Sequence, residues 1–217
     1  MTSEIQGGQD EAVRATASLL QGEVAAASDA TTIALLQHEA GVVHEALGEA
    51  PLAARDYLAA YNAHADFREP LEALVRILSR RRSFKNLAKL LDAMAKSAPT
   101  AEERARALRE LATIALEQEK NLAEAERLLE EAVTENPDDM AAWLEIELLA
   151  AGRDDHLGCM RAIEARLPLV GDATYKALLY IQLAEYAAKN EQTSRAYEYL
   201  DAAARAQRAL RPHQCDF

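Results

Sequence analysis

The amino-acid sequence predicts an all-α protein, a solenoid of antiparallel helix pairs, on three observations. One packing position recurs five times, at steps of 34, 38, 34 and 37 residues, and a small residue occupies it in four of the five cases. Each time a bulky side chain follows four places later. Half of the 217 residues are hydrophobic, and they recur at helical spacing with no alternating pattern long enough to predict a sheet. Glycine and proline fall mainly between the apolar segments. The recurring sites are Ala53, Leu87, Ala125, Cys159 and Ala196, and the bulky partners are Tyr57, Leu91, Leu129, Ile163 and Leu200.

The N-terminal part predicts a tail followed by three helices. Residues 1–8 are short and polar and end in two glycines, so we expect a disordered tail. Asp10 is a candidate cap for a helix that runs to about residue 27. A second helix is expected from Thr31 to about residue 47, where Gly48 ends it, and Pro51 suits the first turn of the third.

The middle of the chain predicts two helix pairs. Pro70 begins a helix that ends in a turn at residues 80–83, and the antiparallel second helix of the pair ends before Pro99. Thr100 with Glu103 is typical of a capping box, so the next helix begins there. That helix turns at residues 120–121, and its partner returns to residue 136.

Two further pairs complete the prediction. Asp139 caps a helix that turns at residues 152–155, and a short helix follows over about 156–167. Asp172 caps the last pair, which extends to residue 210. The total is about eleven helices, one N-terminal and five pairs, in a single solenoid over residues 9–210 with a C-terminal tail over 211–217.

The unit boundaries resemble those of tetratricopeptide repeats. The best example is Asn136-Pro137-Asp138-Asp139-Met140-Ala141-Ala142-Trp143-Leu144, in which a helix-ending proline, an acidic cap and an aromatic residue follow one another. The resemblance covers roughly residues 34–210 and implies a right-handed solenoid. It also implies an inner groove, lined by the first helix of each pair, that binds a segment of a partner protein.

Aligning the tetratricopeptide-like repeat with each helix pair of this chain identifies the residues that are predicted to line the groove. The family's carboxylate clamp for peptide C-termini is disfavoured, because His38 and Val42 stand where that clamp needs Lys and Asn. The C-terminal half of the groove is apolar and suits a partner helix or extended segment, although each apolar residue there could instead belong to the core. The predicted groove residues are Leu35, His38, Val42, Arg76, Glu110, Ile114, Leu144, Leu148, Leu178, Ile181 and Glu185.

A basic cluster marks the middle of the chain. Residues 68–109 carry a net charge of +6 and the remainder −18. Five of these cations lie at or just after the turn at residues 80–83. They form an edge that binds an anion or an acidic partner, or they are simply cations placed favourably at a helix C-terminus. A third possibility is contact with the acidic ends of another copy. Its residues are Arg80, Arg81, Arg82, Lys85 and Lys89.

Several classes of function are disfavoured. The net charge of −12 argues against a nucleic-acid binder, and no apolar run is long enough to span a membrane. Two cysteines predict a reducing, cytoplasmic location, and the Ala- and Arg-rich style suggests a bacterial source. No catalytic or phosphate-binding motif is present, and no cofactor or metal is expected. His156 and Cys159 are interpreted as a surface residue and a packing residue.

The sequence therefore predicts a non-catalytic scaffold or adaptor that binds a protein or peptide. One alternative is a regulatory or sensory domain of a larger protein. An enzyme with a helical-repeat body is a weaker alternative. A further alternative is self-association through the C-terminal helix, from Thr193 to residue 210.

Overall fold

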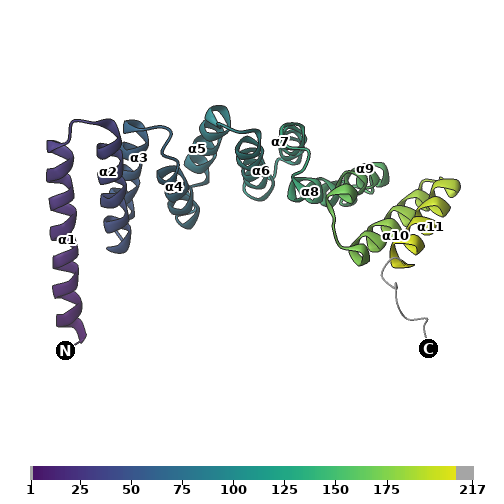
Figure 1. Ribbon diagram of the computed structural model, residues 1–217, viewed down its shortest axis with the longest axis horizontal. Helices are drawn as coiled ribbons and strands as arrows, with labels where there is room; N and C mark the ends of the chain where they lie inside the picture. The colour runs from purple at the N-terminus through teal and green to yellow at the C-terminus, as the bar shows by residue number, and fades with distance from the viewer. Residues whose placement is uncertain (1, 209–217) are drawn as a thin grey trace. The chain divides into compact units, whose positions relative to one another are not determined.

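The protein is built from α-helices that follow one another as antiparallel pairs (Figure 1). A computed structural model describes the backbone of residues 2–208 and the side chains of residues 11–208. Within this range there are eleven α-helices, one short 3-10 helix and no strand, which confirms the predicted all-α class. The α-helices are α1 (Thr2–Ala26), α2 (Ala30–Ala46), α3 (Ala50–Ala63), α4 (Glu69–Arg80), α5 (Phe84–Ser97), α6 (Ala101–Glu117), α7 (Leu122–Glu135), α8 (Met140–Ala151), α9 (His156–Arg166), α10 (Ala173–Lys189) and α11 (Thr193–Arg208), and η1 is the 3-10 turn Leu167–Leu169.

The N-terminal helix is longer than predicted. Helix α1 begins at Thr2, so the expectation of a disordered tail over residues 1–8, with a cap at Asp10, is wrong. Adding residues to an existing helix gains one hydrogen bond per residue, which lets α1 continue through Gly7 and Gly8. The predicted tail over 211–217 lies outside the described residues.

Side-chain caps fix most of the helix starts that the sequence indicated. The Thr100 hydroxyl accepts a hydrogen bond from the Glu103 N–H at 3.2 Å, as the capping box predicts. Asp139 accepts from two backbone N–H groups of α8, and Asp172 accepts from the Tyr175 N–H at 2.6 Å. Helix α2 starts one residue earlier than expected, because Asp29 is its cap. Such caps satisfy N–H groups that a helix leaves unpaired.

The turn inside each helix pair contains one residue in the left-handed backbone region. These residues are Gly48, Arg82, Lys120, Asp154 and Glu191, with φ between 53° and 72°. Their spacings are again 34, 38, 34 and 37 residues, so the backbone repeats with the period that the side chains predicted. In four of the five turns the next residue donates its N–H to the carbonyl five residues earlier, as in the Schellman motif.

The chain forms two compact units, residues 1–90 (the N-terminal unit) and residues 91–217 (the C-terminal unit). In the N-terminal unit, α2 and α3 approach closely where Gly41 meets the Tyr57 ring. A Cβ atom at Gly41 would lie 2.6 Å from Tyr57 Cε1. Ala53 and Ala60 are fully buried beside this contact. Small residues on one helix and a ring on the other thus set the packing distance. A single continuous solenoid over residues 9–210 stays a prediction.

The C-terminal unit has two clusters of buried side chains. One joins α6, α7 and α8 and is formed largely by alanine and leucine, and the other joins α9, α10 and α11. The recurring small sites of the sequence lie inside this core, since Ala125 and Cys159 are fully buried and Ala196 is nearly so. Among the residues that the structure describes, no helix combines the length and apolar character needed to cross a bilayer.

Candidate partner-binding surface

Helix α8 is apolar on the face that it exposes as well as on the face that it buries. Ala142, Ile146 and Ala150 are buried in the core of the C-terminal unit. On the other side Leu144 and Leu148 are exposed, and Leu148 keeps 62% of its surface accessible. The outer face of a surface helix is normally polar, so two exposed leucines one turn apart indicate a contact site.

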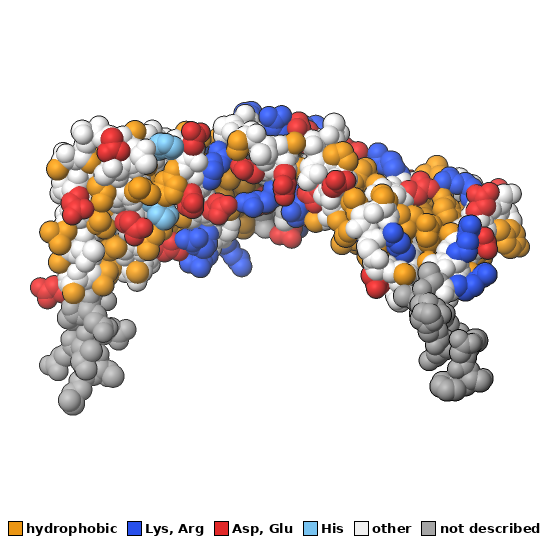
Figure 2. Space-filling model, viewed as in Figure 1, with side chains coloured by type: hydrophobic (Ala, Val, Ile, Leu, Met, Phe, Trp, Pro, Cys, Tyr) orange, Lys and Arg blue, Asp and Glu red, His pale blue; other side chains and the backbone are white. Residues whose placement is uncertain are grey.

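Helix α10 carries a second exposed apolar pair, Tyr175 and Leu178. Leu178 keeps 54% of its surface accessible, while Ile181, one turn further on, is half-buried and Glu185 is exposed. Figure 2 shows hydrophobic side chains gathered over the stretch of chain from α8 to α11. Tyr175 was not among the predicted groove residues, although its spacing of three from Leu178 places both on one helix face.

A buried ion pair connects these two helices. Arg166 of α9 is only 2% exposed. Its Nη2 contacts the carboxylate of Glu147 on α8, and its Nη1 donates to the Tyr175 hydroxyl at 3.2 Å. Arg166 therefore links Glu147 on the buried side of α8 to Tyr175 in the first turn of α10. We call the four exposed residues, Leu144, Leu148, Tyr175 and Leu178, the C-terminal apolar surface.

A half-buried carboxylate borders this surface. Glu145 follows Leu144, and burial raises its pKa, an effect that Arg109 opposes. The Arg109 Nη1 atom lies 3.7 Å from Glu145, and its Nε donates to Asp139 at 3.3 Å. Two carboxylates therefore share one guanidinium group, and the site keeps an excess of negative charge.

The predicted groove residues of α2 differ in how far they are exposed to solvent. Leu35 and Val42 of α2 are exposed. His38 packs between aromatic rings, with ring centroids 5.4 Å from Tyr57 and 5.2 Å from Phe67. Its imidazole is therefore mostly held by internal contacts. That these residues bind a partner stays a prediction.

Glu45 of α2 binds two of the predicted basic residues. Its carboxylate receives two hydrogen bonds from Arg76, at 2.7 and 3.2 Å, and one from Arg80 at 3.1 Å. The Tyr57 hydroxyl donates to it as well, at 3.1 Å. The Arg76 hydrogen bonds are the main cause of the lowered pKa of Glu45. Burial, followed by the bond to Glu45, raises the pKa of Tyr57 to about 12.

This pairing gives Arg76 and Arg80, which were predicted to bind a partner, a contact inside the protein; that either of them binds a partner stays a prediction. Both guanidinium groups share the single carboxylate of Glu45 within the N-terminal unit, so only one of their two positive charges is offset. The other four residues of the basic cluster, Arg81, Arg82, Lys85 and Lys89, are exposed. Whether they bind an acidic partner stays a prediction.

Ile114 is not a groove residue. It is 7% exposed and lies in the core, because its position on α6 faces the packed side of the helix. Glu110, one turn earlier, is half-buried and engaged in an interaction with another residue. The apolar surface thus rests on α8 and α10, without a contribution from Ile114.

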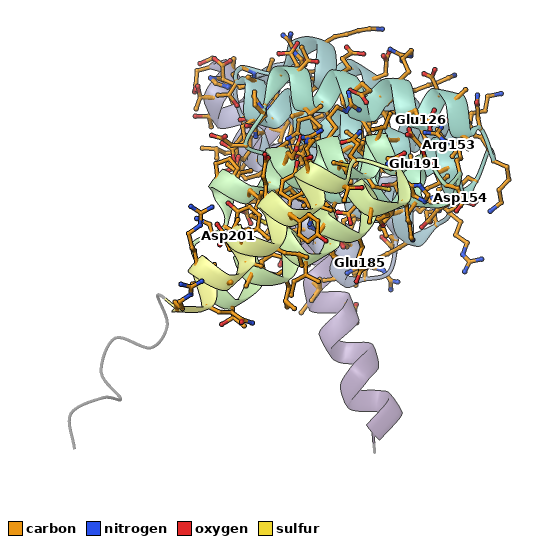
Figure 3. The ribbon with its side chains drawn as sticks, turned by 90° about the vertical axis from the view of Figure 1, so that its right-hand side faces the viewer. Glu126, Arg153, Asp154, Glu185, Glu191 and Asp201 are labelled. Carbon is orange, nitrogen blue, oxygen red and sulfur yellow. The ribbon has the colours of Figure 1, made fainter. Side chains whose placement is uncertain are left out.

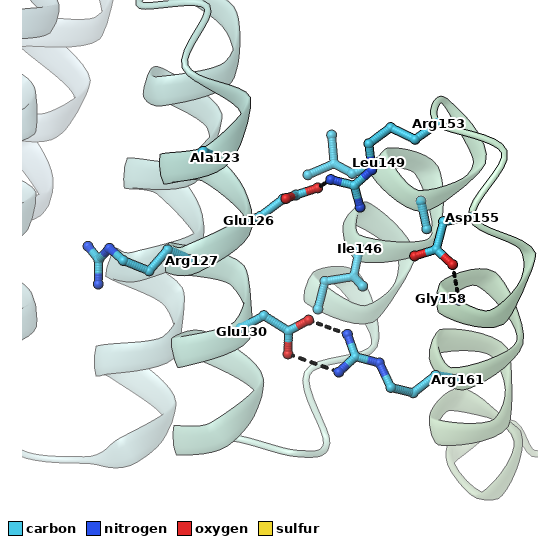
Figure 4. A pocket seen from close by; sticks show the side chains of 11 residues that line it. Ala123, Glu126, Arg127, Glu130, Ile146, Leu149, Arg153, Asp155, Gly158 and Arg161 are labelled. Carbon is cyan, nitrogen blue, oxygen red and sulfur yellow. Dashed lines mark hydrogen bonds and ion pairs between the residues drawn. The ribbon is translucent and has the colours of Figure 1, made fainter.

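A charged cleft separates α7 from α8 and α9 (Figure 4). Its volume is about 380 Å³, with Ile146 and Leu149 among its lining residues. Two ion pairs cross it, Glu126 with Arg153 and Glu130 with Arg161. Figure 3 shows Glu126 and Arg153 at one edge of the molecule. This cleft was not predictable from the sequence, because its ion pairs join distant positions on different helices.

Cys159 and His156, two residues with metal-binding or nucleophilic chemistry that lie close together in sequence, are both held in packing contacts. Within the part of the chain that the structure describes, no three His, Cys, Asp or Glu side chains group as metal ligands. Cys159 is buried, burial raises its pKa, and its thiol contacts the Glu147 carbonyl at 3.7 Å. The His156 ring packs on Tyr186, with centroids 5.6 Å apart. A thiol with a raised pKa is a poor nucleophile at neutral pH.

Comparisons with solved structures identify the fold. A crystal structure of a MamA protein is similar over 85% of this chain and 98% of its own, with 15% identity and a TM-score of 0.52. PilF of Pseudomonas aeruginosa is similar over 95% of each chain, with 20% identity and a TM-score of 0.52. A tetratricopeptide repeat protein from Parabacteroides merdae is similar over 94% of this chain and 77% of its own, with 14% identity and a TM-score of 0.52.

These similarities confirm the predicted tetratricopeptide-like helical repeat. At this level of identity they establish the fold alone, because one fold supports unrelated functions. No protein-family model and no curated protein matches the chain.

Proposed function

We propose that the protein is a non-catalytic scaffold or adaptor that holds an amphipathic segment of a partner protein on the C-terminal apolar surface. The single observation that carries this proposal is the exposure of Leu144, Leu148, Tyr175 and Leu178 on two consecutive first helices. A partner helix that presents apolar residues at helical spacing would cover them.

The arrangement of the surface supports binding better than catalysis. Its residues are aliphatic or aromatic, and the arginine that contacts Tyr175, Arg166, is paired with Glu147. Apolar burial is the main favourable term in protein association, and such a surface offers it without reactive groups.

The finer parts of the proposal rest on composition. The net charge of −12 favours a protein partner over a nucleic acid. Cys159 is a free, buried cysteine, which supports a cytoplasmic location. Exposed Tyr197 and Leu200 on α11 leave self-association through that helix as a further prediction.

The test compares two variants that add the same charge at equally exposed leucines. Leu178→Asp alters the apolar surface, whereas Leu157→Asp changes a leucine of α9 with similar exposure, 56%, outside it. Immobilised wild-type protein and both variants are used to capture partners from an extract of the source cells, and circular dichroism checks their folding. We expect a defined partner to be retained by wild type and Leu157→Asp and lost with Leu178→Asp. Retention of that partner by folded Leu178→Asp would contradict the proposal.

A further inference from the structure

We propose that the segment bound by the C-terminal apolar surface is basic as well as apolar, combining leucine-like anchors with Lys or Arg. This inference rests on the proposed function and adds the chemistry of the partner. It is carried by the carboxylates that border the surface and by the positions of the neighbouring cations.

The first carboxylate is Glu145. It adjoins Leu144 and is half-buried, so it has lost part of its hydration. Its only basic partner in the described chain is Arg109, at 3.7 Å, and that guanidinium is shared with Asp139. A partner cation placed beside Leu144 would supply the missing counter-charge and replace the lost water.

The second carboxylate is Glu185 of α10, labelled in Figure 3. It lies two helical turns after Leu178 and therefore on the same face of α10. No ion pair to it forms within the residues that the structure describes, and Lys189, one turn further on, lies over the Tyr186 ring at 5.5 Å instead. Glu185 is thus free to meet a cation of a partner.

The cations near the surface do not cancel these charges. Arg166 is buried and bound to Glu147. Lys176 is half-buried and lies about 200° around the helix from Leu178, at 100° per residue, so it points to the opposite side of α10.

The composition of the chain agrees with this local picture. Residues 91–217 contain 24 acidic and 15 basic side chains, a net charge of −9. Four exposed cations that follow one another closely, Arg81, Arg82, Lys85 and Lys89, belong to the N-terminal unit. An acidic segment would therefore be attracted to that cluster and repelled from the apolar surface, whereas a basic segment would be attracted to the surface.

The experiment uses two designed amphipathic peptides of about 18 residues, long enough to form a helix. Both carry the same leucine stripe, and their polar positions are all Lys in one and all Glu in the other. Each is labelled with fluorescein, and its binding to the full chain is measured by anisotropy at about 0.05 M and 0.3 M salt, on either side of physiological screening. The variants are Leu178→Asp, Leu157→Asp and the double variant Glu145→Gln/Glu185→Gln.

We expect the Lys peptide to bind at least about tenfold more tightly than the Glu peptide at low salt. The double variant should weaken binding of the Lys peptide by about fivefold or more, because it removes one half-buried and one exposed carboxylate that would pair with lysines of the peptide. Leu178→Asp should abolish binding of the Lys peptide, and Leu157→Asp, which adds the same charge, should preserve it.

The remaining outcomes separate this inference from the proposed function. If the Glu peptide binds as tightly as the Lys peptide, and Leu178→Asp abolishes both, the surface binds apolar segments and the charge preference is wrong. If the double variant binds the Lys peptide like wild type, the charge preference is also wrong. If neither peptide binds, or if Leu178→Asp and Leu157→Asp behave alike, the proposed function fails as well.

Discussion

Arg166 is the side chain that departs most from the repeat. The equivalent positions in three other helix pairs are Ala60, Ala132 and Ala203, all fully or nearly fully buried. A long cation at such a place needs a counter-charge, which Glu147 provides, and a partner for its second amino group, which is the Tyr175 hydroxyl. The repeat period located position 166, but it could not show that the arginine would be buried.

Removing one member of this pair should be costly. We expect Arg166→Met to lower the free energy of unfolding by about 3–5 kcal/mol, because Glu147 would be left buried without a counter-charge. The double variant Arg166→Met/Glu147→Leu should recover most of this loss. Urea denaturation followed by circular dichroism measures both. A loss below about 1 kcal/mol in the single variant, within the usual range for exposed pairs, would show that the pair is not buried in solution.

Tyr57 makes a pH-dependent contribution to stability. Its folded-state pKa is raised to about 12, whereas an unfolded tyrosine titrates near 10. Above about pH 10 the unfolded chain loses this proton first, so the free energy of unfolding falls as pH rises through the window from 10 to 12. Below that window the contribution is fully present.

We therefore expect the stability difference between wild type and Tyr57→Phe to shrink as pH rises from about 9 to about 11.5. At neutral pH the variant should be less stable by about 1 kcal/mol, the contribution of a typical hydrogen bond. Urea titrations at several pH values measure the difference. A difference that stays constant over this range would argue against a raised pKa of Tyr57, and therefore against the burial of its hydroxyl and the hydrogen bond to Glu45.

Helix boundaries were the most predictable part of the structure. Thr100, Asp139 and Asp172 cap helices where the sequence indicated, because a cap depends on residues three apart in the chain. The start of α1 was missed, since glycines favour but do not force a helix end. The contacts of Glu45 with Arg76 and Arg80 were also missed, because they span 31 and 35 residues between separate helices.

Close packing within a helix pair gives a prediction with a built-in control. Gly41→Ala should destabilise the protein by about 1–3 kcal/mol, because the new methyl group would overlap the Tyr57 ring. Gly22→Ala, on exposed α1, meets no atom within 4 Å and should stabilise it by about 0.5–1 kcal/mol through helix propensity. Thermal unfolding compares the two variants. Equal effects of both would contradict the close approach of α2 and α3.

The apolar surface was only partly predictable from sequence. The frame of the repeat placed Leu144, Leu148 and Leu178 in the groove or the core, and all three are exposed, but it treated Ile114 in the same way, and Ile114 is buried. All four are apolar residues of first helices, so composition could not separate them. The rotation of each helix about its axis decides which face is exposed, and it depends on contacts between helices distant in sequence.

The division into two compact units predicts separable unfolding. The only tryptophan, Trp143, lies in the C-terminal unit, and its indole N–H donates to the Pro137 carbonyl at 2.8 Å. Its fluorescence therefore reports on that unit, whereas circular dichroism reports on helices of both. In helical repeats, stability is a sum of local and nearest-neighbour terms, so a change in one unit need not affect the other.

We expect Gly41→Ala to lower the urea midpoint of the transition seen by circular dichroism and to leave the Trp143 fluorescence transition unchanged, because its steric overlap lies in the N-terminal unit. Arg166→Met should shift the fluorescence transition together with the part of the circular dichroism change that comes from the C-terminal unit, since the lost ion pair lies there. Non-coincident probes are a direct sign that unfolding is not two-state. If both variants shift both transitions equally, the two units unfold as one cooperative block, and the energetic coupling between them exceeds what their separate cores indicate.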